Sequence, residues 1–235
     1  MHYVGGELEL FGEARRWKGY LARQIAPFLG ERVLEVGAGI GGTTTALFEA
    51  AEGPCRAWLC LEPDLDLAAE LRRRVNDGTL ASLCTVRSGT VAALAEGELF
   101  DAILYIDVLE HIEDDAGELR RVAAHLTPRG RLVVMSPAHP WLYSPFDASV
   151  GHHRRYTRAS LLAVAPRGLA PICVRYLDAF GLLASLANRV ALREAMPTAR
   201  QLAFWDRFLV GPSSHVDRFL WYSVGKSILG VWRRV

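Results

Sequence analysis

The chain has 235 residues, of which 51% are apolar and 23% are charged, and its formal net charge is +1. This is the composition of a globular domain with a substantial core, and the nearly neutral charge argues against a general attraction to nucleic acid or anionic membranes. The N-terminus lacks the features of a signal peptide and no apolar run approaches the roughly 20 residues that span a bilayer, so we expect a cytoplasmic protein without an integral membrane segment.

Strands and helices are predicted to alternate through the first 135 residues. Apolar side chains at helical spacing predict a helix over 13–29. Further helices are expected over about 41–50, from 64 to about 76, and over 114–126, where Pro128 and Gly130 would end the last one. Short apolar runs predict five strands, over residues 32–36, 57–61, 83–87, 100–106 and 131–135. This alternation predicts a doubly wound sheet with ligands at the carboxyl ends of its strands.

The pattern loosens after residue 135. Residues 136–157 contain three prolines and are expected to form a substrate loop, and Thr157 is a candidate N-cap for a helix over 158–165. Strands are predicted over 172–177 and 225–232, and the mostly helical segment 180–222 between them has expected breaks at Pro197 and at Gly211-Pro212. We therefore predict one α/β domain over 1–235 with a mostly parallel seven-stranded sheet. Residues 1–30 would form an N-terminal lid, and 180–222 a helical cap inserted before the last strand.

The first predicted strand runs into a glycine turn in the sequence VLEVGAGIGG, residues 33–42. Glu35 lies two residues before Gly37, and a carboxylate at a strand end suits a cationic ligand, such as the ammonium and sulfonium of S-adenosylmethionine. Gly37 and Gly39 allow the backbone to turn tightly and a ligand to approach it. The turn also satisfies the dinucleotide fingerprint GxGxxG, and Glu62 could accept hydrogen bonds from a ribose in either case. A nicotinamide-dependent oxidoreductase therefore remains an alternative.

Together with FDAILYIDVLEHIEDD at residues 100–115, these motifs resemble class I S-adenosylmethionine-dependent methyltransferases over about 30–135. Residues 136–163 and the terminal GKSILGVW are similar to a bacterial small-molecule branch of that superfamily. The resemblance implies S-adenosylmethionine as the cofactor. It implies contacts to the methionine end from Glu35, Gly37, Gly39, Asp107 and Val108, to the ribose from Glu62, to the adenine from Pro63, Gly89 and Thr90, and to the cofactor from Tyr20 of the N-terminal helix. The family often has an acidic residue beside the adenine, and residues 87–90 contain none.

Three histidines are the candidate catalytic residues. His111 follows the fourth strand, and an ordinary histidine pKa near 6.5 would let it accept a proton at neutral pH; the alternative is that it only orders the loop. His152 and His153 lie in the segment expected to cover the substrate. We expect no metal site, because no carboxylate or cysteine lies at ligand spacing from these two histidines.

Four residues are candidates for substrate binding. Arg154 and Arg155 could clamp a carboxylate or phosphate through paired donors, or they could pair with Asp147 or a helix dipole. Tyr143 and Tyr156 could stack on an aromatic substrate, or pack at the root of the loop.

These expectations predict methyl transfer from S-adenosylmethionine to a small, aromatic or anionic biosynthetic intermediate, with a carbon, nitrogen or oxygen acceptor. The alternatives are a lipid-linked sugar or quinone precursor at a membrane surface, the oxidoreductase, and a non-catalytic binding module. No nucleic-acid partner is expected, because residues 106–109 lack the Asn/Asp-Pro-Pro-aromatic signature of enzymes that methylate amino groups of nucleic acids. The apolar residues of 180–222 leave a homodimer open.

Overall fold

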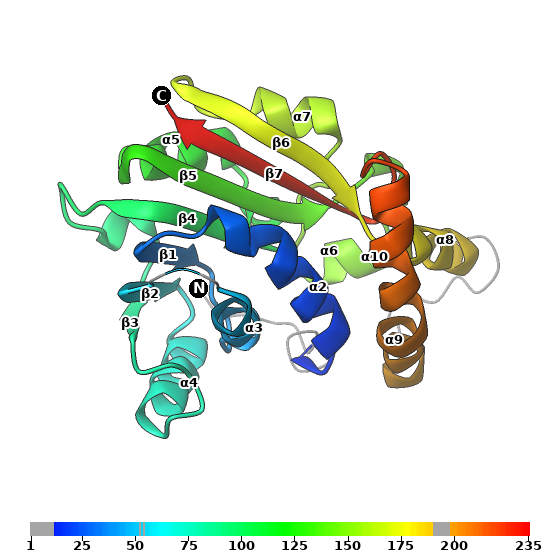
Figure 1. The fold of residues 1–235 in the computed structure, drawn as a ribbon, viewed down its shortest axis with the longest axis horizontal. Coiled ribbons are helices and arrows are strands. Elements are labelled where there is room, and N and C mark those ends of the chain that lie inside the picture. Colours follow the sequence, from blue (N-terminus) through cyan, green and yellow to red (C-terminus); the bar gives the residue numbers. More distant parts are fainter. Residues whose placement is uncertain (1–11, 52, 54, 190–197) are drawn as a thin grey trace.

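The computed structural model describes residues 12–51, 53, 55–189 and 198–235 and contains a seven-stranded sheet. Its strands are β1 (Arg32–Val36), β2 (Ala57–Glu62), β3 (Cys84–Ser88), β4 (Phe100–Ile106), β5 (Leu126–Pro137), β6 (Leu169–Leu177) and β7 (Ser227–Arg234). They are arranged in the order β3-β2-β1-β4-β5-β7-β6, and only β7 runs antiparallel to its neighbours (Figure 1). The predicted α/β class with a mostly parallel sheet is confirmed.

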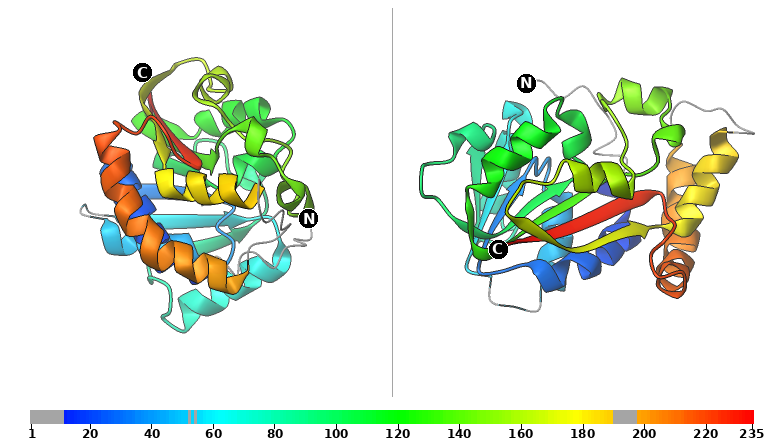
Figure 2. Two further views of the ribbon diagram at one scale, coloured as in Figure 1. Left: turned by 90° about the vertical axis from the view of Figure 1, so that its right-hand side faces the viewer. Right: turned by 90° about the horizontal axis from the view of Figure 1, so that it is seen from above.

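Helices cover both faces of the sheet (Figure 2). The α-helices are α2 (Arg15–Ile25), α3 (Gly42–Ala50), α4 (Leu65–Asn76), α5 (Asp115–Ala123), α6 (Pro145–Ser149), α7 (Arg158–Ala163), α8 (Ala179–Ala187), α9 (Ala199–Phe204) and α10 (Val210–Phe219). Shorter turns are η1 (Ala26–Phe28), η2 (Val91–Ala93), η3 (Leu109–His111) and η4 (Pro140–Leu142), and η6 (Trp205–Leu209) is a π-helix. One core, around Trp58, lies under α2 and α3, and a second, around Tyr105 and Trp232, lies under α5 and α7.

The two central strands place the first site residues side by side. Strands β1 and β4 are parallel, with Val36 opposite Tyr105, and nearly all their side chains are buried. A strand covered on both faces is apolar along its length, so the buried Glu35 is an exception within β1. The register brings the glycine turn after β1 next to Asp107 after β4.

The fifth strand is longer than predicted. It begins at Leu126 and includes Pro128 and Gly130, which we expected to lie between the helix and the strand. A shift of register between Phe100 and Ala102 interrupts the pairing here, and Arg129 has a φ of 65°. Such a bulge accommodates a proline, which has no N–H, within a strand. Pro128 and Gly130 therefore mark an irregularity within β5 and do not end the preceding helix.

The helical segment before β7 is inserted as predicted and stands beside the carboxyl ends of the parallel strands (Figure 1). The prediction of a helix break at Gly211-Pro212 is wrong, because η6 leads directly into α10. Pro212 lies in the first turn of α10, where a missing N–H costs little; Pro197 lies outside the described residues. Within the described part of the chain, none of the helices has the length and apolar character that crossing a membrane requires.

Candidate functional site

A cleft of about 150 Å³ opens at the carboxyl ends of β1 and β4. Helix α2 forms one wall, the turn between β1 and α3 forms the floor, and the end of β4 closes the cleft. The lining residues are Trp17, Lys18, Leu21, Glu35, Gly37, Ala38, Gly39, Ile40, Gly42, Thr43, Ile106 and Asp107. The cleft therefore contains four of the residues predicted to bind the cofactor, namely Glu35, Gly37, Gly39 and Asp107.

The glycine turn exposes bare backbone at two positions in the floor of the cleft. Gly37 and Gly39 have φ values of 67° and 56°, in the left-handed region that favours glycine. A Cβ atom on Gly37 would lie 2.6 Å from Cγ2 of Val108, closer than any real contact. Val108 therefore fixes the turn from outside, because it packs against the bare backbone of Gly37.

Glu35 presents a buried carboxylate to this cleft. The hydroxyl of Thr44 and the indole N–H of Trp58 both donate to its Oε2, at 2.7 and 2.9 Å. These two bonds fix the orientation of the carboxylate and leave Oε1 available to a ligand. Burial raises the pKa of Glu35 to about 7, although the two hydrogen bonds oppose this shift. A cationic group in the cleft would favour the ionised form.

Glu62 connects the glycine turn to the next strand. Its Oε2 accepts the N–H of Gly39 at 2.8 Å and its Oε1 accepts the N–H of Asp64 at 2.9 Å. A carboxylate has about four acceptor positions, so each oxygen can still accept a bond from a ligand. Burial raises the pKa of Glu62.

The predicted adenine residues lie at the same edge of the sheet but do not line the cleft. The N–H of Gly89 donates to the carbonyl of Glu62 at 2.9 Å, which fixes the end of β3 beside the end of β2. Pro63 follows β2 directly, and Thr90 follows Gly89. Their contact with the adenine stays a prediction.

Helix α2 lines the cleft with residues other than Tyr20, which we predicted to contact the cofactor. Tyr20 is buried, and its hydroxyl donates to Asp217 of α10 at 2.8 Å, away from the residues that line the cleft. Trp17 and Lys18 line the cleft instead, and the Lys18 ammonium lies over Gly42. Trp17 is also buried as part of the core beneath α2. Sequence reasoning missed Lys18, although Trp17, Lys18 and Leu21 have the spacing of a single helix face.

Asp107 closes the cleft at the end of β4. Its backbone has a φ of 53°, and its N–H donates to the carbonyl of Met135 at 2.9 Å, which orders the turn. Desolvation of its carboxyl by the surrounding protein raises the pKa of Asp107 to about 6, and the nearby His152 and Lys226 oppose this shift. Asp107 therefore joins the cleft to the group of histidines beyond it.

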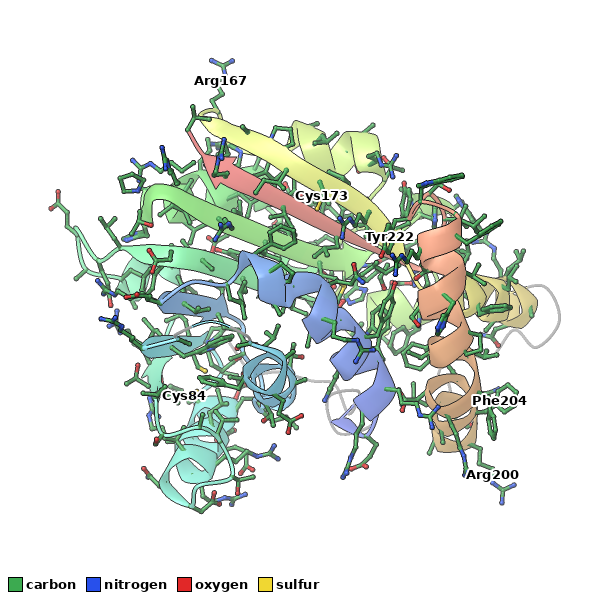
Figure 3. The ribbon with its side chains drawn as sticks, viewed as in Figure 1. Cys84, Arg167, Cys173, Arg200, Phe204 and Tyr222 are labelled. Carbon is green, nitrogen blue, oxygen red and sulfur yellow. The ribbon has the colours of Figure 1, made fainter. Side chains whose placement is uncertain are left out.

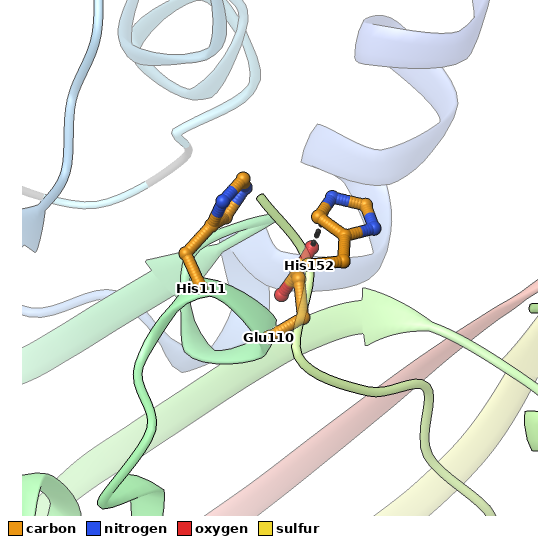
Figure 4. A group of neighbouring side chains, drawn as sticks. All are labelled: Glu110, His111 and His152. Carbon is orange, nitrogen blue, oxygen red and sulfur yellow. Dashed lines mark ion pairs between the residues drawn. The ribbon is translucent and has the colours of Figure 1, made fainter. Parts of the chain in front are cut away.

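The structure brings two of the three predicted histidines together. The rings of His111 and His152 meet edge to face with centroids 4.6 Å apart, and Glu110 lies beside them (Figure 4). Burial, with the nearby histidines, lowers the pKa of His111 to about 4, so its ring is neutral at physiological pH. His153 is exposed; its backbone N–H donates to the carbonyl of Glu110 at 2.8 Å, and its ring is not part of the group.

The four predicted substrate residues make contacts within the fold. Arg155 forms a two-pronged pair with Asp147, at 2.8 and 2.9 Å, which was the alternative that we named. Arg154 pairs with Asp115 at 2.8 Å, and the Tyr156 hydroxyl donates to the same carboxylate at 2.7 Å. The Tyr143 hydroxyl donates to the carbonyl of His152 at 2.6 Å. These pairings hold the 136–157 loop in place, as the named alternative for the two arginines expected, and contact of the four residues with a substrate stays a prediction.

Comparisons with known proteins agree with this geometry. A family model described as "Methyltransferase domain" matches residues 10–196. Demethylmenaquinone methyltransferase of Tropheryma whipplei (strain Twist) is 29% identical over 136 residues, which cover 55% of this chain and 52% of that protein. This chain thus matches about half the length of that relative.

Solved structures are similar over most of the chain. An S-adenosylmethionine-dependent methyltransferase from Mesorhizobium loti has a TM-score of 0.61 at 18% identity, with 96% of this chain and 100% of that chain covered. The N-methyltransferase NodS from Bradyrhizobium japonicum WM9, solved in complex with S-adenosyl-L-homocysteine, has a TM-score of 0.57 at 15% identity, with coverages of 95% and 87%. At these identities the likeness concerns the fold.

Proposed function

The chain belongs to the methyltransferase family and is an S-adenosylmethionine-dependent enzyme, and from this premise we propose that it methylates a polar atom of a small molecule at the Asp107 end of the cleft. Family membership removes the nicotinamide-dependent alternative. The observation that carries the proposal is the buried carboxylate of Glu35, held at a glycine-floored cleft with one oxygen available.

The residues of the cleft fit the cofactor. Gly37 and Gly39 line the cleft with backbone alone, so a ligand can approach the turn closely there. Glu35 would attract the cationic methionine end, and Glu62 would accept bonds from the ribose hydroxyls. Lys18, on the opposite wall, offers a cation to a ligand carboxylate.

S-adenosylmethionine, when bound, supplies an electrophilic methyl group whose bond to sulfur breaks with the electron pair left on sulfur. An acceptor hydroxyl or amine forms the new bond with its lone pair and must release its proton. Asp107 lines the cleft, the His111–His152 pair follows it in the turn after β4 and in the loop, and these are the groups of this chain that would orient the acceptor. Helix α2 and the cap would limit access of water.

A direct test supplies the purified protein with S-adenosylmethionine carrying a radiolabelled methyl group and a panel of phenols, carboxylic acids and amines. We expect label to appear in at least one acceptor class. Tight binding of S-adenosylhomocysteine without transfer to any acceptor would instead favour a non-catalytic binding module.

Replacement of Glu62 by alanine is expected to weaken binding of S-adenosylhomocysteine by about 1–3 kcal/mol, or roughly 5- to 150-fold. The variant removes the ribose acceptor and also releases the N–H of Gly39. Calorimetric titration measures the change, with Glu70→Ala as the control, because Glu70 pairs with Arg74 on the surface of α4. Unchanged affinity in Glu62→Ala would show that the ribose lies elsewhere.

A second candidate acceptor is a lipid-linked sugar or quinone precursor. The match to demethylmenaquinone methyltransferase favours it, and so does the cap, whose Phe204, Phe219 and Trp221 are 57%, 78% and 86% exposed. Phe204 and the nearby Arg200 point outward from α9 (Figure 3). Aromatic and basic side chains on one exposed helix are typical of proteins that bind a membrane interface.

Co-sedimentation with vesicles that contain anionic lipid tests this candidate. We expect binding that the Phe204→Ser and Phe219→Ser changes weaken, with Leu65→Ser as the control, because Leu65 is 70% exposed but lies on α4. If the unmodified protein stays in the supernatant, the acceptor is a freely dissolved small molecule.

A further inference from the structure

We propose that Glu110, His111 and His152 together bind one divalent transition-metal ion at the acceptor end of the cleft. The role given to the ion rests on the proposed function, but its binding does not. The expectation of no metal site was based on spacing along the chain, whereas the fold brings Glu110, from a distant part of the chain, beside His152.

The three side chains come from two segments that the fold brings together. Glu110 and His111 belong to η3 after β4, and His152 belongs to the loop after α6. One ligand atom from each lies within 4.8 Å of the others (Figure 4). Tetrahedral ligands about 2.0–2.2 Å from a single ion lie about 3.3–3.6 Å apart, so rotations that bring these atoms about 1 Å closer would complete the set.

Glu110 has an unused acceptor aimed at this group. The side chain is fully buried, and its Oε2 accepts the hydroxyl of Ser136 at 2.9 Å. Its Oε1 is also buried but receives no hydrogen bond, and Nε2 of His152 is 3.9 Å away. A buried polar atom without a partner is costly, and a metal ion between Glu110 and His152 would provide that partner.

His152 is oriented as metal-binding histidines commonly are. Its Nδ1 lies 2.9 Å from Oδ1 of Asp147, a carboxylate oxygen that can only accept, so Nδ1 carries the proton and Nε2 faces Glu110. Metal-ligating histidines commonly donate their other N–H to a carboxylate in this way. Asp147 is itself held by Arg155 and Ser144, so the ring direction is set before any ion arrives.

Two imidazoles and one carboxylate suit Zn²⁺, Co²⁺, Ni²⁺ or Mn²⁺ better than Mg²⁺ or Ca²⁺, which prefer oxygen ligands. Three protein ligands leave positions open for a ligand. The site lies next to Asp107, so an acceptor with a hydroxyl or carboxylate oxygen could coordinate the ion there. A metal-bound hydroxyl releases its proton to the surrounding water more readily, which would leave an oxygen acceptor with the lone pair that forms the bond to the methyl group.

The test uses the whole protein after removal of metals with a chelator, and Co²⁺ as a spectroscopic probe. We expect saturable binding of one Co²⁺ with visible absorption bands, and displacement of Co²⁺ by Zn²⁺. Glu110→Gln and His152→Gln should each weaken binding at least about tenfold. His153→Gln is the matched control, because His153 neighbours His152 on the same loop but lies outside the group, and it should retain the affinity.

Circular dichroism confirms that each variant is folded, and calorimetry with S-adenosylhomocysteine is performed on the same samples. Equal Co²⁺ binding by the unmodified protein and the Glu110→Gln/His152→Gln double variant would overturn the proposal, as would no binding at all. If metal binding fails while S-adenosylhomocysteine still binds, only this inference falls. If S-adenosylhomocysteine does not bind the unmodified protein, the proposed function falls instead.

Discussion

Replacement of Asp147 by alanine is expected to destabilise the protein by about 3–5 kcal/mol, the usual cost of removing one partner of a buried ion pair. Asp147 is fully buried and accepts bonds from Arg155, His152 and Ser144. The side chain of Arg155 is only 10% exposed, so it would keep its charge without a partner. Burial opposes ionisation, but the bonds from His152 and Arg155 hold the pKa of Asp147 well below its usual range, so this stability is present above about pH 4 and is lost only as the pH falls further.

Urea unfolding followed by circular dichroism measures the loss. Glu31→Ala is the control, because its ion pair with Arg56 is 3.3 Å long with both side chains largely exposed, and exposed pairs contribute about 0–1 kcal/mol. The double variant Asp147→Ala/Arg155→Met should recover part of the loss, because it removes both charges. A loss below about 1 kcal/mol in Asp147→Ala would contradict the view that this pair holds the 136–157 loop.

The arginines show why this part of the site could not be predicted from sequence. Arg154 and Arg155 are adjacent, and a pair of guanidinium groups in a loop is equally suited to a bound anion or to internal carboxylates. In the fold, Asp147 and Asp115 lie against them, which supports the internal role. The same contacts determine where His152 points, so the geometry at the acceptor end depends on pairings that the sequence does not specify.

The sheet and the cofactor side of the site were easier to predict from the sequence. Strands β1 and β4 have the predicted bounds because they are buried on both faces and read as apolar runs with clear ends. Glu35 and Gly37 are close in the chain, so their relative positions at the end of β1 follow largely from the spacing of the motif. The errors occurred at Pro128 and Pro212, where a bulge and a π-helix accommodate prolines that normally end an element.

Binding of S-adenosylhomocysteine is expected to strengthen as the pH rises toward 7 and then to level off. The pKa of Glu35 is raised to about 7 by burial, and the ionised carboxylate is the form that attracts the ligand ammonium. If only the ionised form binds well, affinity falls by up to about tenfold for each pH unit below that pKa. Calorimetric titrations between about pH 5.5 and 7.5 measure this slope while the ligand amine remains protonated.

The variant Glu35→Gln separates this effect from the titration of Glu62 and Asp107, which it leaves in place. Its amide oxygen can still accept bonds from Thr44 and Trp58, but binding at pH 7.5 should weaken by about 1.5–3 kcal/mol, and the dependence of affinity on pH should become shallower.

The stability of the unliganded protein should decrease as the pH rises, whereas its affinity for the ligand increases. The raised pKa means that the folded state holds a proton that the unfolded state releases between pH 4.5 and about 7, so stability falls as the pH rises. The variant should therefore be more stable than the parent above pH 7, by up to about 3 kcal/mol. A variant that binds S-adenosylhomocysteine as tightly as the parent across this range would show that Glu35 only supports the fold and that the ligand ammonium is held by another group.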